Sequence, residues 1–184
     1  MLKKSSFKLS IASLALVVAI SAGIKLYAAY VGQAVTGLQI IDVYDNPKVM
    51  PYFGQKVISI MYTDPDVKDV NDPLSDAMDA KKYDKTKLCA MGIANCKDTW
   101  IPNAGIRMKA KQKQNQFPDS VILLDENKTL SGAWQLGNCD GAGVVIIIGK
   151  DKKIKYIKYV KSKDESRAII GEVLPILDAE IAKK

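Results

Sequence analysis

The chain has 184 residues, 48% hydrophobic and 26% charged, a composition typical of a globular protein that buries its own core. It contains no histidine, which excludes His-containing catalytic triads, His-ligated zinc and imidazole acid–base catalysis. Residues 1–29 hold four lysines and no acidic residue, so the rest of the chain carries 23 basic and 20 acidic side chains. This small excess lacks the clustered positive charge of nucleic-acid-binding proteins, and we expect no nucleic-acid partner.

The first 29 residues have the pattern of a secretory signal peptide. Three lysines among the first eight residues precede an uncharged apolar run from Leu9 to Ile24, and small residues follow it. This run is shorter than the roughly 20 apolar residues that a membrane-spanning helix needs. The alternative is an uncleaved anchor in the inner membrane, because the chain is apolar again just after Lys25. In both cases residues 30–184 are exported, which predicts a periplasmic location and membrane contact only through an uncleaved anchor.

Strand and helix patterns alternate along residues 30–184, which are predicted to form one domain. Asp72 is expected to cap the first helix ahead of Pro73; a capping box at Ser162–Glu165 opens the last helix, which Pro175 is expected to kink or split. In chain order, the predicted elements are a leader strand at 38–43 that Asp45-Asn46-Pro47 ends, a strand at 56–62, a helix from 72, a strand at 88–93, a helix at 104–114, a strand at 121–124, a short apolar helix containing Leu130 and Trp134, strands at 143–148 and 154–160, and a helix from 162. Trp134 is predicted to lie in the core.

This order predicts a parallel sheet built by right-handed crossovers, to which the late hairpin adds an antiparallel strand. Such a mixed α/β sheet with flanking helices fits the thioredoxin-like fold in its peroxiredoxin-type version. Several short motifs from Lys56 onward add a second similarity: Asn71-x-Pro73-Leu74-x-x-Ala77, Phe117-Pro118-x-Ser120, Leu124-Asp125 and Ala133-Trp134-Gln135-Leu136. With these motifs the chain resembles the YtfJ family of small exported bacterial proteins. The resemblance implies a thioredoxin-like fold and a periplasmic location, and it implies no established reaction.

No cysteine stands where thioredoxin-like and peroxiredoxin-like enzymes carry their reactive one. Those enzymes place the thiol just after the first central strand, at a helix N-terminus whose dipole stabilises the thiolate. Residues 63–72 (TDPDVKDVND) take that place here, and their acidic side chains would raise the pKa of a thiol. We therefore expect neither ordinary dithiol exchange nor the usual peroxidase chemistry.

The three cysteines of the chain are expected to have structural roles. Cys89 lies inside an apolar strand and is predicted to be a buried core thiol. Cys96 and Cys139 are in loops predicted at the carboxyl edge of the sheet, and in an oxidising compartment we expect them to form a disulfide. The alternative is a divergent thiol-disulfide or peroxide-handling oxidoreductase that uses Cys96 and Cys139 as its reactive cysteines.

Trp100 and a group of aspartates are the candidate binding residues at the same edge. Trp100 is an apolar residue in a loop, and Asp64 and Asp66 follow the first central strand. Asp64, Asp66, Asp69 and Asp72 also offer the oxygen ligands that calcium prefers, but the loop lacks the glycine and the distal glutamate of an EF-hand. We expect no metal site, and the alternative is a calcium site at these four aspartates.

Basic side chains are concentrated in two places. Seven lysines lie along the predicted late hairpin and just after it, at positions 150, 152, 153, 155, 158, 161 and 163. Such a stripe is typical of an edge strand that lysines protect from pairing with another chain, and contact with anionic lipid, cell-wall polymer or an acidic partner is the alternative. The basic side chains of the helix at 104–114 are interpreted as a solvated face.

Together these features predict an exported, non-catalytic thioredoxin-fold module that binds a protein partner or a small ligand at the carboxyl edge of its sheet. We expect no cofactor, and we expect the partner to be a periplasmic or envelope protein. Trp100, Asp64 and Asp66 are the predicted contact residues, with Cys96 and Cys139 as scaffold. The oxidoreductase alternative requires an exposed, reactive cysteine, whereas the binding module requires an exposed apolar patch near Trp100.

Overall fold

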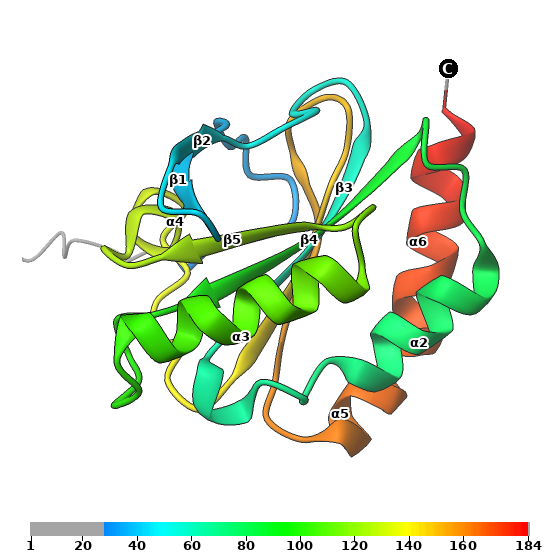
Figure 1. Ribbon diagram of the computed structural model, residues 1–184. Helices are drawn as coiled ribbons and strands as arrows, with labels where there is room; N and C mark the ends of the chain where they lie inside the picture. The colour runs from blue at the N-terminus through cyan, green and yellow to red at the C-terminus, as the bar shows by residue number, and fades with distance from the viewer. Residues whose placement is uncertain (1–27, 184) are drawn as a thin grey trace, which may run out of the picture.

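A seven-stranded mixed sheet forms the centre of residues 28–183, the part of the chain that this computed structural model describes (Figure 1). Across the sheet the strands follow the order β2-β1-β5-β4-β3-β6-β7. They are β1 (Gln39–Asp42), β2 (Pro47–Val49), β3 (Val57–Thr63), β4 (Leu88–Asn95), β5 (Val121–Asp125), β6 (Gly143–Ile148) and β7 (Ile154–Val160). β3, β4 and β5 are parallel to one another and β6 and β7 form the predicted antiparallel hairpin. The predicted signal peptide or anchor at residues 1–29 lies almost entirely outside the described residues.

Helices cover both faces of this sheet. They are the short 3-10 helix η1 (Pro65–Val67), α2 (Asp72–Lys81), α3 (Asn103–Gln116), α4 (Thr129–Ala133), α5 (Lys163–Ala168) and α6 (Ile170–Ala182). Successive side chains of a strand point to opposite faces. On β5, Leu124 packs with Ile106 of α3, whereas Leu123 packs with Leu130 of α4. None of the helices within residues 28–183 is long and apolar enough to cross a membrane.

The continuous apolar runs of the central strands follow from this double cover. All six residues of β6 are buried, and so are the first four of β3. Trp134, which is only 1% exposed, is the largest side chain of the core on the α4 side of the sheet, as the sequence predicts. Cys89 belongs to the same core and is buried, which confirms the second core prediction.

The helix starts confirm one capping prediction and correct another. Ser162 caps α5 as predicted, because its Oγ accepts a hydrogen bond from the backbone N–H of Glu165 (3.2 Å). Asp72 does not cap α2. Asn71 is the N-cap residue, and Asp72 lies in the first turn, where its carboxylate pairs with Lys163 (3.4 Å).

The interruption of the last helix falls at Ile169, between α5 and α6, and not at Pro175 as predicted. Because α6 begins at Ile170, Pro175 falls in its second turn, where the missing N–H removes a single helical hydrogen bond. Ile169 is buried among the residues that pack α2, α5 and α6 together.

The two edges of the sheet are formed by β2 and β7. β7 is the edge strand that the lysine stripe predicts, and its Lys155 pairs with Asp151 (2.7 Å). At the other edge the predicted leader strand forms a hairpin, in which Pro47 opens β2 although we expected it to end the strand. A proline is tolerated there because an outermost strand leaves one side of its backbone unpaired.

Candidate functional site

The ends of the three parallel strands meet the loop that precedes β6 at the carboxyl edge of the sheet, at the lower left of Figure 1. This is where α/β folds place their binding and catalytic groups. Asp64 follows β3, Cys96 follows β4 and Asp125 ends β5, while Cys139 lies in the loop before β6. The sequence-predicted candidates are therefore on one edge, but they differ in exposure and in contacts.

Asp64 is completely buried and joins the loop after β3 to the loop before β6. Its carboxylate accepts hydrogen bonds from the backbone N–H groups of Asp66 (2.9 Å) and Gly141 (2.7 Å), and its own N–H donates to the carbonyl of Ala142 (3.0 Å). Asp66 is exposed, and its carboxylate accepts a hydrogen bond from Thr99 Oγ1 (2.8 Å). Asp64 is thus out of reach of a partner, whereas Asp66 holds the loop that carries Trp100.

The four aspartates of the alternative calcium site have separate partners. The four aspartates do not converge, because Asp64 and Asp66 bond to neighbouring loops, Asp69 pairs with Lys68 (3.1 Å) and Asp72 is directed to Lys163. Within residues 28–183 no group of three or more acidic, cysteine or histidine side chains is placed to hold a metal ion.

Asn71 stands at the N-terminus of α2, the helix that follows the first central strand, and no cysteine lies among residues 64–81. Its side chain is 4% exposed, and its Nδ2 donates a hydrogen bond to Thr63 Oγ1 (2.8 Å). The backbone of Gly143 passes so close that a Cβ atom there would lie 2.5 Å from Asn71 Nδ2. A neutral amide, packed against the ends of β3 and β6, therefore begins this helix, and no thiol stands at its N-terminus.

The predicted Cys96–Cys139 disulfide is absent, and all three cysteines are buried free thiols. Cys96 packs with Ile106 and Leu124 on the α3 side of the sheet, whereas Cys139 packs with Trp134 on the α4 side. The two thiols are thus on opposite faces, a separation that loop positions in the sequence do not reveal.

Burial dominates the electrostatics of these thiols. Desolvation raises the pKa of Cys96 to about 12, and the carboxylates of Glu126 and Asp125 add to the shift. Desolvation and Asp98 raise the pKa of Cys139 to about 11. Burial also raises the pKa of Cys89. All three thiols are therefore protonated at neutral pH, which disfavours nucleophilic attack.

Trp100 is 84% exposed, the most exposed of the large hydrophobic side chains within the described residues. It stands just before α3, on which Met108 is also exposed because it points away from the buried Ile106 and Ala110. Tyr44 lies beside the same helix, with Lys111 Nζ 5.5 Å from the centre of its ring.

We call the exposed residues on α3 and beside it the α3 face: Tyr44, Trp100, Met108, Lys109 and Lys111. The helix beneath it contains four basic residues and no acidic one. From the sequence, Trp100 is a predicted contact residue, whereas the basic side chains of the helix are interpreted as a solvated face. Helical spacing was the signal that would have shown Met108 on its outer side.

A buried polar network, which the sequence analysis missed, fixes α4 to the end of β5. The carboxylate of Asp125 accepts hydrogen bonds from the backbone N–H groups of Thr129 (2.6 Å) and Leu130 (3.0 Å) and from Tyr62 Oη (3.1 Å). Burial raises the pKa of Tyr62, so its hydroxyl stays a hydrogen-bond donor. The Leu124-Asp125 motif was the only sequence signal for this network.

A family model described as "Bacterial protein of unknown function (YtfJ_HI0045)" matches residues 46–178. The chain belongs to this family. An uncharacterized protein of Haemophilus influenzae is 29% identical over 99 residues, which are 53% of this chain and 52% of that protein. The uncharacterized protein YtfJ of Escherichia coli is 27% identical over 93 residues, 50% of this chain and 49% of that protein. The chain thus matches about half the length of these relatives.

Solved structures establish the fold of this family member as thioredoxin-like. A putative thiol:disulfide interchange protein DsbE from Chlorobium tepidum aligns with a TM-score of 0.60 and 12% identity over 82% of this chain and 99% of that one. A peroxiredoxin-like protein from Aquifex aeolicus aligns with a TM-score of 0.54 and 14% identity over 80% and 90%. These structural alignments support the predicted fold. Sequence identities this low carry no activity to this chain.

Proposed function

We propose that this protein is an exported, non-catalytic module that binds a partner protein of the bacterial periplasm or envelope. The observation that carries the proposal is the N-terminus of α2, where the packed amide of Asn71 stands and no thiol is present for the helix dipole to stabilise. The cysteines are buried, and the pKa values of Cys96 and Cys139 are raised, which also argues against the oxidoreductase alternative. The basic, apolar pattern of residues 1–29 supports export.

The α3 face is the surface on which we place the partner. Tryptophan side chains are prominent among the residues that dominate protein–protein affinity, and Trp100 contributes nothing to the core of its own chain. The bond between Thr99 and Asp66 holds its loop against η1, so the indole is presented from a fixed position.

The charge of the α3 face indicates the kind of partner. Lys109 and Lys111 flank Met108, and no acidic residue of α3 offsets them. Arg107 is engaged by Glu126 (2.6 Å) and Asp45 (3.0 Å), so it fastens the β1–β2 turn to the helix. The free charges that remain favour an acidic segment that also carries apolar side chains for contact with Trp100 and Met108.

Site-specific crosslinking in intact cells tests this proposal. A photoreactive phenylalanine analogue replaces Trp100, Met108 or, as a control, the exposed Tyr52 on the opposite edge of the sheet. We expect one protein to be crosslinked from positions 100 and 108 and not from 52. With that protein purified, Trp100→Ala should weaken binding roughly 30-fold or more, the loss of about 2 kcal/mol typical of a dominant contact residue. Equal crosslinking from all three positions, or unchanged binding of Trp100→Ala, would contradict the proposed surface.

A further inference from the structure

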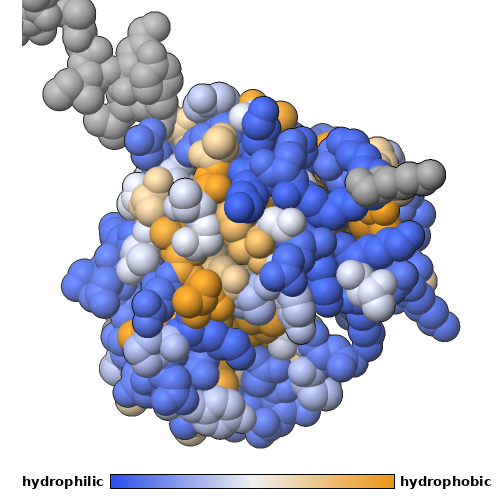
Figure 2. Space-filling model, turned by 90° about the horizontal axis from the view of Figure 1, so that it is seen from above, coloured by the Kyte–Doolittle hydropathy of each residue, from blue (hydrophilic) through white to orange (hydrophobic). Residues whose placement is uncertain are grey.

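A pocket of about 310 Å³ opens at the amino edge of the sheet, opposite the carboxyl edge. It is formed where four segments meet: Val57 begins β3, Lys87 precedes β4, Lys150 is in the β6–β7 turn and Ile181 is in the last turn of α6. This edge is at the top of Figure 1 and faces the viewer in Figure 2, where hydrophobic surface lies among hydrophilic side chains. The pocket is separate from the α3 face and independent of the proposed function.

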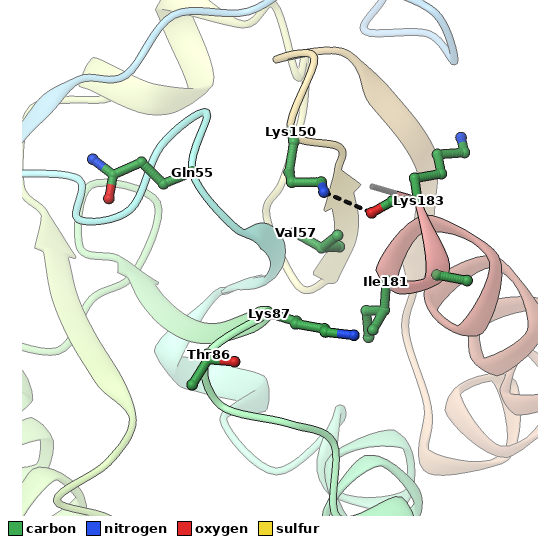
Figure 3. A pocket seen from close by; sticks show the side chains of 8 residues that line it. Gln55, Val57, Thr86, Lys87, Lys150, Ile181 and Lys183 are labelled. Atoms are coloured by element: carbon green, nitrogen blue, oxygen red, sulfur yellow. Dashed lines mark hydrogen bonds between the residues drawn. The ribbon is translucent and has the colours of Figure 1, made fainter.

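Lysine side chains give the pocket its charge. Lys87 and Lys150 enter it from different segments, and Lys87 extends toward Ile181 (Figure 3). Lys150 Nζ donates a hydrogen bond to the backbone carbonyl of Lys183 (2.7 Å), a neutral partner that leaves its charge uncompensated. Lys87 makes no ion pair within residues 28–183.

Three carboxylates lie near the pocket, and each already has partners. Asp84 accepts hydrogen bonds from Thr86, and these bonds and the charges of Lys87 and Lys56 lower its pKa; Asp151 pairs with Lys155 (2.7 Å), and Glu180 bonds to the Lys183 side chain. No acidic side chain lines the pocket itself. Two ammonium groups thus face a hollow whose lining, within the described residues, contains no acidic side chain; Asp84 lies near Lys87 but outside that lining.

The base of the pocket is apolar. Val57 is almost fully buried beneath it, and Ile181 forms one wall. The volume is at the lower end of the range for small-molecule sites, larger than a simple inorganic ion requires. A ligand that matches this surface needs an anionic group for the lysines and an apolar part for the two aliphatic side chains.

We propose that this pocket binds a small organic anion, with its carboxylate or phosphate between Lys87 and Lys150 and its apolar part against Val57 and Ile181. Since α6 ends at this pocket, the ligand would bridge the end of the helix and the start of the sheet. A ligand that binds the folded state and not the unfolded state raises the thermal stability of the protein.

Backbone amide NMR titrations of residues 28–184 at low ionic strength test the proposal, provided that this segment gives a dispersed spectrum; otherwise the full chain in detergent is used. The probes are hexyl phosphate, hexanoate, inorganic phosphate and hexanol. We expect the two amphipathic anions, hexyl phosphate and hexanoate, to shift the amide resonances of Thr86, Lys87, Lys150 and Ile181. The anion that binds more tightly identifies the preferred head group. Inorganic phosphate and hexanol, which each offer half of the required chemistry, should bind at least about fivefold more weakly. Salt at 0.3 M should weaken the binding, because it screens exposed charges.

Two matched variants make the result specific. Lys87→Gln should lower the affinity about fivefold, the upper range for a partly exposed ion pair, whereas Lys109→Gln on α3 should leave it unchanged. Lys87→Gln removes no hydrogen bond or ion pair of the described chain, so its melting temperature without ligand should equal that of the unsubstituted protein. The proposal is overturned if neither anion shifts these amides, if hexanol binds equally well, or if Lys87→Gln binds as the unsubstituted protein does.

Discussion

Replacing Trp134 with alanine is expected to lower the free energy of unfolding by about 3–5 kcal/mol, the usual cost of deleting a buried indole. The side chain is 1% exposed and lies in the core between the sheet and α4. Its Nε1 donates a hydrogen bond to the carbonyl of Thr36 (3.1 Å), and its ring lies 6.4 Å from that of Phe53 between centroids. The substitution therefore removes apolar contacts, an aromatic contact and one hydrogen bond together.

Trp100→Ala is the matched control for this prediction, since these are the only two tryptophans of the chain. Trp100 is 84% exposed, and its loss should change the unfolding free energy by no more than about 0.5 kcal/mol. Urea denaturation followed by circular dichroism measures both variants. A large destabilisation by Trp100→Ala would mean that this side chain serves the fold and would remove the reason for placing a partner on it.

Asp64→Ala is expected to lower the free energy of unfolding by about 3 kcal/mol, because two part-buried hydrogen bonds to its buried carboxylate are lost. The donors are the N–H groups of Asp66 and Gly141, which connect the loop after β3 with the loop before β6. The loss should therefore affect the whole carboxyl edge.

Asp66→Ala is the control, because within residues 28–183 this exposed carboxylate accepts only the hydroxyl of Thr99 among side-chain groups. We expect it to cost less than about 1 kcal/mol in unfolding free energy. It should instead weaken partner binding by releasing the loop of Trp100. Equal stability losses in the two variants, measured by urea denaturation, would show that Asp64 is not the residue that joins these loops.

The order of strands and helices was accessible from the sequence because local patterns determine it. The strand predicted at 143–148 is apolar at every position, which is typical of a strand covered on both faces, and β6 has those bounds. The capping box at Ser162 predicted the start of α5 for an equally local reason. Trp134 was assigned to the core because it falls within an apolar helical segment.

The candidate site was less predictable because it depends on which way loop residues face. Asp64 is in a polar loop and looked exposed, yet the loop before β6 covers it completely. Cys96 and Cys139 were correctly placed in loops at the same edge, but the sheet separates the two side chains. Such orientations depend on tertiary packing, which neither periodicity nor spacing records.

The central claim is that the thioredoxin-like fold of this family member is used without thiol chemistry. The most direct measurement is the alkylation rate of each cysteine in the native protein between pH 6 and pH 10, with the modified residues identified by mass spectrometry. The same rates in 8 M urea provide the control, since unfolded thiols have ordinary pKa values near 8.5.

A raised pKa keeps a thiol protonated until the pH approaches it. With the pKa of Cys139 at about 11, fewer than about one in a thousand of these thiols is ionised at pH 7. We therefore expect all three native cysteines to react far more slowly than in urea, with rates that still rise at pH 10. Suppose that a native cysteine reacts at pH 7 as fast as in urea, and that its alkylation rate reaches half of its maximum below pH 8. This result would contradict the central claim and restore the oxidoreductase alternative.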